Sequence, residues 1–311
     1  MADRSLEELN RALREDARAV IEAEDARYRA FVTEVAERVT ESGNVRILLL
    51  AGPSGSGKTT TANMIADAVR ARGHESHVVS LDNFYREAHD PYYPKRPDGT
   101  RDFESCDALD LPLACRTLRL AAQGEAFDVP HYDFKSGCYF PEPYHFGATE
   151  DGLLIVEGLH ALNPVLTEAI PHDRCVKLFI SVSTNLTYGA ERVLSGRKLR
   201  FVRRLVRDSL YRGASADLTL SMWPGVLHGE DTYLYPYRDA ADICMDTFHA
   251  YEAGLMAPFA LRVLSEATDK DDFVRTVCEA MRLSHPIEDA LVPQDALMRE
   301  FIPGGKYEHL Y

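Results

Sequence analysis

Apolar and polar residues along the chain follow two alternating patterns, which together predict an α/β fold. Short apolar runs bounded by turn residues are typical of buried parallel strands. We expect such strands at residues 45–51, 77–82, 152–158, 175–182 and, as a closing edge strand, 241–247. Apolar residues three or four positions apart predict helices at 5–40, 58–72 and 111–122, and a helical pattern runs through 251–283. Strands separated by helices indicate a parallel sheet flanked by helices.

A further helix is predicted in residues 199–213, and its two faces differ in charge. At about 100° per residue, five arginines fall within about 120° of one another. These are Arg197, Arg200, Arg203, Arg204 and Arg207. The opposite face carries Val202, Leu205, Val206 and Leu210. We expect the apolar face to pack and the basic face to meet anions; the alternative is a solvated face near acids such as Asp208.

Composition limits the kinds of protein that this chain can be. It has 311 residues, 45% of them hydrophobic, which is enough for one large domain or two small ones. The N-terminus is charged and no apolar run reaches about 18 residues, so we expect a cytoplasmic protein without membrane insertion. Its six cysteines lack C-x-x-C spacing, which predicts reduced thiols without zinc. A net charge of −14 argues against nucleic acid as a partner, so any anion site must be local.

The stretch GPSGSGKTT, residues 52–60, matches the pattern G-x-x-x-x-G-K-[ST] between a predicted strand and a predicted helix. Glycines let backbone N–H groups curl around phosphate oxygens, and the helix N-terminus adds positive charge. Lys58 is expected to neutralise the β and γ oxygens, and the Thr59 hydroxyl to coordinate Mg²⁺. The alternative is a simple glycine-rich connection. We expect ATP and Mg²⁺ as cofactors, with the nucleotide held by Gly52, Ser54, Gly55, Ser56, Gly57, Lys58, Thr59 and Thr60.

Two carboxylates stand at the ends of predicted strands, on the sheet edge that carries the glycine loop. Asp82 follows the second strand, and Glu157 lies at the end of the third. Ligands of open α/β sheets bind at this edge. A carboxylate there can accept a proton from an attacking hydroxyl or hold a metal. Each acid alone could also cap a helix or serve a turn, but the two together favour chemistry.

Several motifs give the chain a resemblance to a known family. The motifs GPSGSGKTT, SLDNFYR, DFESCDALDLP, VPHYDF, IVEGLHAL and RRLVRDSLYRG occur in order. Over residues 45 to about 250 the chain resembles the uridine kinase and phosphoribulokinase family of P-loop kinases, in particular its bacterial uridine kinase-like branch. The resemblance implies a nucleoside-monophosphate-kinase-like fold. It also implies that ATP phosphorylates the 5′-hydroxyl of a nucleoside, uridine or cytidine, to give the monophosphate.

The resemblance also implies roles for individual residues near the acceptor. Asp82 resembles the catalytic base and also approaches the metal and the acceptor. Glu157 resembles the second carboxylate on the magnesium side. Glu104 stands where uridine kinases carry an aspartate that binds the ribose hydroxyls, and Tyr132 matches an aromatic residue near the nucleoside.

The arginine helix acquires a role through the same resemblance. Arg204, Arg207 and Arg212 match the arginines of a lid, about residues 195–228, that closes over the triphosphate and the acceptor. Arg204 and Arg207 would be catalytic together with Lys58, because guanidinium groups stabilise the charge that develops on a transferring phosphoryl group. Arg204 would also contact the acceptor, and Arg212 the nucleotide.

The sequence departs from the uridine kinase pattern at positions that contact the base. Gly137 replaces a base-contacting histidine, Ala214 replaces the second lid arginine, and Met222 replaces a base-binding glutamine. These losses should relax or redirect selectivity. Other aromatic residues could stack on a base or fill the core: Tyr92, Tyr93, Tyr139, Phe140 and Trp223. His131 and His160 could contact the substrate or be ordinary polar residues.

The same considerations suggest three segments in the chain. We expect an N-terminal helical extension at 1–44, a kinase domain at 45–285 with an acceptor-side insertion at about 83–148, and a C-terminal tail at 286–311. The extension could serve packing, dimerisation or regulation, so a homo-oligomer is possible. An acceptor that is a sugar phosphate or another alcohol is the alternative to a nucleoside, with Lys95, Arg96 and Arg101 available for its phosphate. A nucleotide-binding regulator without efficient turnover is the alternative to an enzyme.

Overall fold

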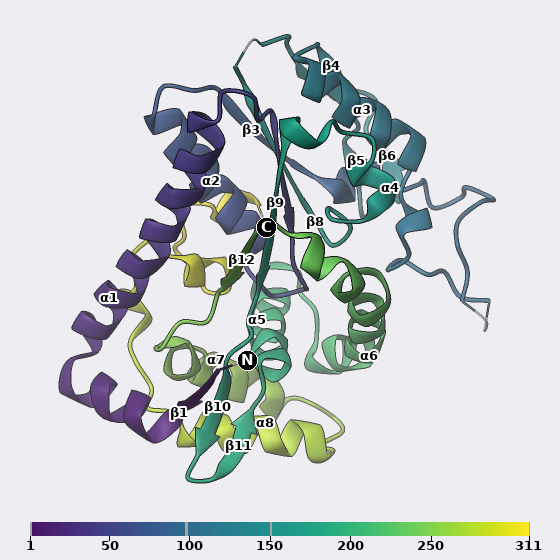
Figure 1. The fold of residues 1–311 in the computed structure, drawn as a ribbon. Helices are drawn as coiled ribbons and strands as arrows, with labels where there is room; N and C mark the ends of the chain where they lie inside the picture. The colour runs from purple at the N-terminus through teal and green to yellow at the C-terminus, as the bar shows by residue number, and fades with distance from the viewer. Residues whose placement is uncertain (1, 97–98, 150, 311) are drawn as a thin grey trace.

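A five-stranded parallel sheet forms the centre of the computed structural model, which describes residues 2–96, 99–149 and 151–310 (Figure 1). Its strands, in spatial order, are β12 (Ile243–Asp246), β9 (Cys175–Ser181), β2 (Ile47–Ala51), β8 (Leu153–Gly158) and β3 (Ser76–Ser80). Every pairing between them is parallel. The predicted parallel sheet is therefore confirmed, with each strand within about two residues of its expected bounds.

Helices cover both faces of this sheet. In Figure 1, α1 (Leu6–Glu41) and α2 (Lys58–Ala71) lie together on one side, whereas α3 (Leu111–Gln123) and the short α4 (Pro164–Thr167) lie on the other. Strand β2 shows the cause, because successive side chains point to opposite faces. Leu48 and Leu50 pack in the cluster that contains α1 and α2, and Leu49 packs in the cluster that contains α3. Both faces of β2 are thus buried, as its continuous apolar run requires.

A second layer of helices and a small sheet lie beyond the C-terminal edge of the central sheet (Figure 1). The helices are α5 (Gly196–Tyr211), α6 (Ala216–Tyr233), α7 (Glu252–Ser265) and α8 (Asp272–Leu283). The small sheet contains β1 (Asp3–Ser5), β10 (Asn185–Tyr188) and β11 (Glu191–Leu194). Neither this sheet nor the break between α7 and α8 was predicted. The strands of the small sheet are short, and β1 pairs with β10, which lies in the middle of the sequence.

The expected acceptor-side insertion forms two small sheets that stand off the central one; its residues 97 and 98 lie outside the described residues. One pairs β4 (Phe127–Val129) with β7 (Tyr144–Phe146), and the other pairs β5 (Tyr132–Asp133) with β6 (Cys138–Tyr139). Short 3-10 helices complete the described chain: Leu81–Phe84, Cys106–Ala108, His172–Arg174, Tyr235–Ala240, Asp289–Leu291, Leu297–Glu300 and Glu308–Leu310.

The N-terminal helix is capped and kinked by its own polar residues. The hydroxyl of Ser5 accepts a hydrogen bond from the backbone N–H of Glu8 and caps the N-terminus of the helix. Asp16 leaves helical geometry, with φ −159° and ψ 89°, and its carboxylate accepts from the backbone N–H of Ala19. It therefore restarts the helix as an internal cap. Beyond the kink, the hydroxyl of Tyr28 bonds to that of Thr61 in α2 at 2.6 Å.

The C-terminal residues are irregular, as expected, but they are also deeply buried. Leu297 packs in the core between α1, α2 and the sheet, while Phe301 and Ile302 are fully buried in the core around α5 and α7. The Tyr307 hydroxyl donates to the carboxylate of Asp67 in α2 at 2.7 Å. The segment is thus built into the same body as the glycine loop.

Two further observations concern the cysteines and the helices. All six cysteines are free, and the most buried of them is Cys106. Within the described ranges, no helix combines the length and the apolar character needed to cross a bilayer.

Candidate active site

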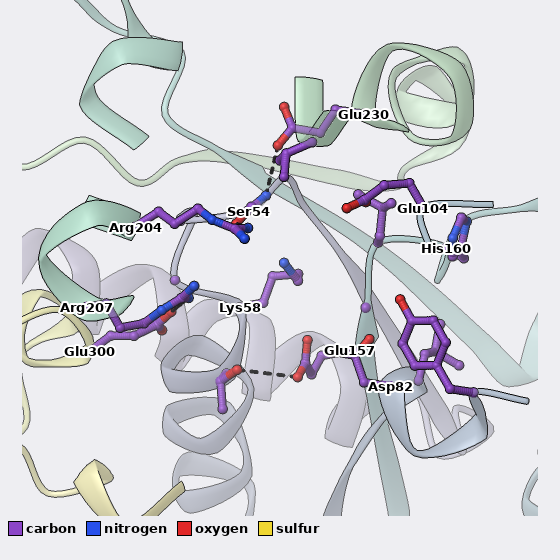
Figure 2. Close-up of a pocket in the computed structure, with 18 of the residues that line it drawn as sticks. Ser54, Lys58, Asp82, Glu104, Glu157, His160, Arg204, Arg207, Glu230 and Glu300 are labelled. Carbon is purple, nitrogen blue, oxygen red and sulfur yellow. Dashed lines mark hydrogen bonds and ion pairs between the residues drawn. The ribbon is translucent and has the colours of Figure 1, made fainter. Parts of the chain in front are cut away.

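A cavity of about 190 Å³ opens at the C-terminal edge of the central sheet. It is lined by the glycine loop, by the ends of β3 and β8, and by α5, α6 and the C-terminal segment. Its charged lining residues are Lys58, Asp82, Glu104, Glu157, Arg204, Arg207, Arg212, Glu230 and Glu300. In Figure 2, Arg204, Arg207 and Glu300 lie on one side and Asp82, Glu104 and His160 on the other, with Lys58 between them. Residues from distant parts of the sequence therefore meet in one polar cavity.

The glycine loop has the backbone geometry of an anion cradle. Gly55 and Gly57 have φ of 74° and 92°, which favour glycine. At Gly55 a Cβ would also lie 2.7 Å from the backbone oxygen of Arg200. Helix α2 begins at Lys58, and its N-cap residue, Gly57, makes no side-chain cap to the first N–H groups. The Lys58 ammonium donates to the backbone oxygen of Pro53 at 3.3 Å. Backbone N–H groups at a helix start and this ammonium are suited to phosphate oxygens.

A buried ion pair supports the glycine loop from behind. Arg200 donates to both carboxylate oxygens of Glu230, at 2.7 and 2.8 Å, and to the backbone oxygen of Ser54 at 2.9 Å. Glu230 accepts in turn from the Ser54 N–H at 3.0 Å. Both side chains are completely buried. The pair therefore holds the Ser54 peptide through its donor and its acceptor.

Arg203 forms a second buried support. Its guanidinium pairs with Glu252 of α7 and donates to the backbone oxygens of Gly55, at 3.3 Å, and Thr247, at 2.7 Å. The expectation that the whole arginine face awaits anions is therefore wrong for Arg200 and Arg203. Because one surface of α5 packs on the glycine loop, these two arginines support the backbone of that loop.

The three arginines expected in a lid gather around one carboxylate. Asp208 lies 3.2 Å from Arg204, 2.9 Å from Arg207 and 3.4 Å from Arg212. Arg204 also donates to the hydroxyl of Ser54 at 2.8 Å. The positive charge of Arg207, with some burial, lowers the pKa of Arg212. One carboxylate faces three guanidinium groups, so the cluster has an excess of positive charge directed at the cavity.

Thr59 and Glu157 form an oxygen-rich corner that fits a magnesium ion. The Thr59 hydroxyl and a Glu157 carboxylate oxygen are 3.3 Å apart, as a dashed line in Figure 2 marks. Hydroxyl, carboxylate and phosphate oxygens are the ligands that Mg²⁺ prefers. Burial raises the pKa of Glu157 to about 7, with Lys58 opposing the shift. A buried carboxylate whose pKa stays raised despite a nearby lysine is an environment that a metal would stabilise.

Asp82 faces the cavity from the end of β3. The Ser80 hydroxyl accepts from the Asp82 N–H at 3.3 Å and starts a short 3-10 helix, which fixes the backbone at this point. The side chain is open to the water of the cavity, yet protein surrounds it closely. This partial desolvation raises its pKa, and Lys58, Arg212 and Arg207 oppose the shift. The carboxylate is thus a better proton acceptor than an ordinary surface aspartate.

Glu104 and His160 define the end of the cavity opposite Arg207. Burial raises the pKa of Glu104 to about 7 and lowers that of His160 to about 4. His160 is 5% exposed, and its Nδ1 has no hydrogen-bond partner within the described part of the chain. At Gly229 of α6 a Cβ would lie 2.5 Å from that of Glu104, so α6 closes this end. A neutral imidazole beside a carboxyl group suits hydroxyl groups of a ligand.

Comparison with known proteins identifies the family. Residues 47–252 match the Phosphoribulokinase / Uridine kinase family. The chain belongs to this family. It is therefore a phosphotransferase of the kind that uses an alcohol group as acceptor. The matched residues include the glycine loop, Asp82, Glu157 and the three clustered arginines, but not the C-terminal segment.

Individual relatives within the family are moderately similar. A uridine kinase from Staphylococcus aureus is 29% identical over 199 residues, which are 63% of this chain and 85% of that protein. A uridine kinase from Schizosaccharomyces pombe is 34% identical over 172 residues, 54% of this chain, and the match spans only 33% of that protein. A solved structure, a proposed fructose transport system kinase from Silicibacter, gives a TM-score of 0.50 at 20% identity, covering 69% of this chain and 98% of its own. That likeness confirms the P-loop kinase fold.

Some residues expected at the site do not line the cavity. These are Gly52, Ser56, Thr60 and Tyr132. Gly52 and Ser56 pack beneath the loop: a Cβ on Gly52 would lie 2.4 Å from the Ile180 oxygen. Tyr132 lies behind Tyr85, with ring centroids 5.9 Å apart, and Tyr85 faces the cavity instead. Trp223 is a core residue against Phe201, so it is not a stacking platform.

Among the polar residues that line the cavity of this family member, sequence reasoning missed Tyr85, Glu230 and Glu300. Tyr85 follows Asp82 by three positions within a quoted motif, so its position was a usable signal. Glu230 and Glu300 reach the cavity through tertiary packing of α6 and of the C-terminal segment. No spacing in the sequence indicated either one.

Proposed function

We propose that this kinase transfers the γ-phosphoryl group of ATP to the 5′-hydroxyl of a nucleoside of the uridine or cytidine type. One observation carries the proposal. The Lys58 ammonium, the Asp82 carboxylate and the clustered arginines all line a single cavity at the end of the sheet. The similarity to proteins named uridine kinase supports the nucleoside as acceptor.

Asp82 serves as the general base in this proposal. Its carboxylate takes the proton of the attacking hydroxyl while the hydroxyl oxygen bonds to the γ-phosphorus. The bond from the γ-phosphorus to the bridging oxygen breaks, and ADP leaves. Desolvation raises the pKa of Asp82, which strengthens its carboxylate as a proton acceptor.

The cations of the cavity stabilise the charge that spreads over the phosphoryl oxygens. Lys58 binds the β and γ oxygens, and Arg204 and Arg207 approach from α5. Thr59 and Glu157 would hold Mg²⁺, which neutralises phosphate charge when bound. Because Asp208 already orients the arginines, little reorganisation is needed during the reaction.

A second candidate is a kinase of a smaller, polyhydroxylated alcohol. Glu104 and His160 offer hydrogen bonds to hydroxyl groups, whereas Gly137 and Met222, where the family pattern has base contacts, do not line the cavity. Lys95, Arg96 and Arg101 do not line it either, which gives a phosphorylated acceptor less support.

The experiment measures ADP release from ATP and Mg²⁺ with uridine, cytidine, ribose and glycerol as separate acceptors. Acceptor-dependent release with a pyrimidine nucleoside supports the first function, and release only with a simple alcohol supports the second. Tight ATP binding without turnover on any acceptor would identify a nucleotide-dependent regulator.

Asp82→Asn tests the mechanism in the same assay. The amide keeps the shape of the side chain but cannot take the proton, so we expect turnover to fall by about 10² to 10⁴. ATP affinity, measured by calorimetry, should change little. Turnover at the wild-type rate would mean that another group accepts the proton.

A further inference from the structure

The C-terminal segment is held together by its own contacts and is bound to α2. Arg299 donates to the backbone oxygen of Val292 at 2.7 Å, and Lys306 and Tyr307 bind the Asp67 carboxylate of α2 at 2.6 and 2.7 Å. Between these anchors, Leu297 fills the space beside Gly57: a Cβ there would lie 2.6 Å from its Cδ1. The segment therefore holds its residue 300 in a defined place beside the glycine loop.

Glu300 projects from this segment into the cavity, as Figure 2 shows. Its carboxylate accepts from the backbone N–H of Thr60 at 3.2 Å and lies 3.8 Å from the Arg207 guanidinium. The residue is only 3% exposed. A carboxylate thus accepts from a backbone N–H and pairs with a guanidinium at the mouth of a phosphate-binding loop.

These two partners are of the kind that phosphate uses. N–H groups at the start of a helix after a glycine loop bind the phosphates of a nucleotide, and arginine pairs equally with carboxylate and phosphate. Two anions cannot share them, and a carboxylate left beside a triphosphate would repel it. Bound nucleotide must therefore displace the Glu300 side chain or bear its repulsion.

We propose that Glu300 is an internal competitor of the nucleotide phosphates, which occupies their position on Thr60 and Arg207 and lowers the affinity for ATP. This inference rests on the proposed binding of ATP at the glycine loop. Only the side chain needs to move, because the flanking Phe301 and Met298 are fully buried. The C-terminal segment, which lies outside the matched family region, would thereby set the nucleotide concentration at which the enzyme works.

The test uses calorimetry to measure the dissociation constant of adenylyl imidodiphosphate, in the presence of Mg²⁺, for the full chain and for its variants. Glu300→Gln keeps the shape and a hydrogen bond to Thr60 but loses the charge, and Glu300→Ala removes both. We expect about tenfold tighter binding for Glu300→Gln, which is about 1.4 kcal/mol, and at least as much for Glu300→Ala. Glu308→Gln is the matched control, because this half-buried acid of the same segment accepts from the Gly304 N–H and does not line the cavity.

The direction of the change decides the proposal. If Glu300 merely supported Arg207 or the helix, its loss would weaken nucleotide binding, and weaker or unchanged binding in both variants overturns the inference. An equal gain in Glu308→Gln would also overturn it, because net charge alone would explain the effect. Failure of the wild-type chain to bind the nucleotide would instead refute the proposed function. Should Glu300→Ala fold poorly, the isosteric Glu300→Gln still gives the direction of the change in nucleotide affinity.

Discussion

Glu230→Gln tests the idea that the buried pair with Arg200 holds the glycine loop. The substitution keeps the shape of the side chain but leaves the Arg200 guanidinium buried without a countercharge, at 0% exposure. Breaking a buried pair in this way costs about 3–5 kcal/mol. With an unfolding entropy of about 2.1 cal/mol/K for each of 311 residues, the melting temperature should fall by about 5–8 °C.

Scanning calorimetry measures this change, and the neighbouring residue supplies the control. Asp231 pairs with Arg197 on the surface, with side chains 51% and 43% exposed, so Asp231→Asn should cost at most about 1 kcal/mol. The double substitution Arg200→Met with Glu230→Leu should recover most of the stability, because an apolar pair needs no countercharge. It should still weaken ATP binding, since the Ser54 N–H loses its acceptor. Equal melting temperatures for Glu230→Gln and Asp231→Asn would refute the reasoning.

Two further predictions concern catalysis and metal binding. Arg204→Ala should lower turnover by about 10³-fold because it removes a guanidinium from the cavity. Arg197→Ala, on the exposed side of the same helix, should leave turnover unchanged, and steady-state kinetics of both variants checks this. Burial raises the pKa of Glu157 to about 7, so the folded protein holds this proton more tightly than the unfolded chain does. Without metal, the free energy of unfolding should therefore fall as the pH rises from about 4.5 to 7. Mg²⁺ needs the ionised carboxylate, so calorimetry should show weaker binding at pH 6 than at pH 8, with proton release; equal affinities would contradict this role of Glu157.

The sheet and the glycine loop could be predicted because their signals are local. The apolar run before Gly52 and the Lys-Thr pair after Gly57 lie within a few residues of one another, and each constrains the backbone directly. Asp82 and Glu157 both line the cavity for a related reason: the ends of parallel strands share one edge of the sheet.

The rest of the cavity depends on contacts that local patterns do not encode. Glu230 and Glu300 come from helix packing and from an irregular segment, and their spacing along the chain carries no period. The arginine stripe shows the opposite failure. Its helical period was correct, but Arg200 and Arg203 have buried acidic partners 30 and 49 residues away. The arginine face of α5 was therefore predicted to bind ligand as a whole, although part of it is a packed interface.

The buried arginines also limit how the expected lid could move. If residues 195–228 closed as one body, Arg203 would separate from Glu252 of α7, and Arg200 from the backbone of Ser54. Each separation would strand a buried charge at a cost of several kcal/mol, which nucleotide binding would have to repay. Arg204 and Arg207, in contrast, need only exchange Asp208 for phosphate oxygens. The structure therefore favours a clamp made of side chains on a fixed helix, with adjustment concentrated near Arg212, where α5 has ended and the side chain is half exposed.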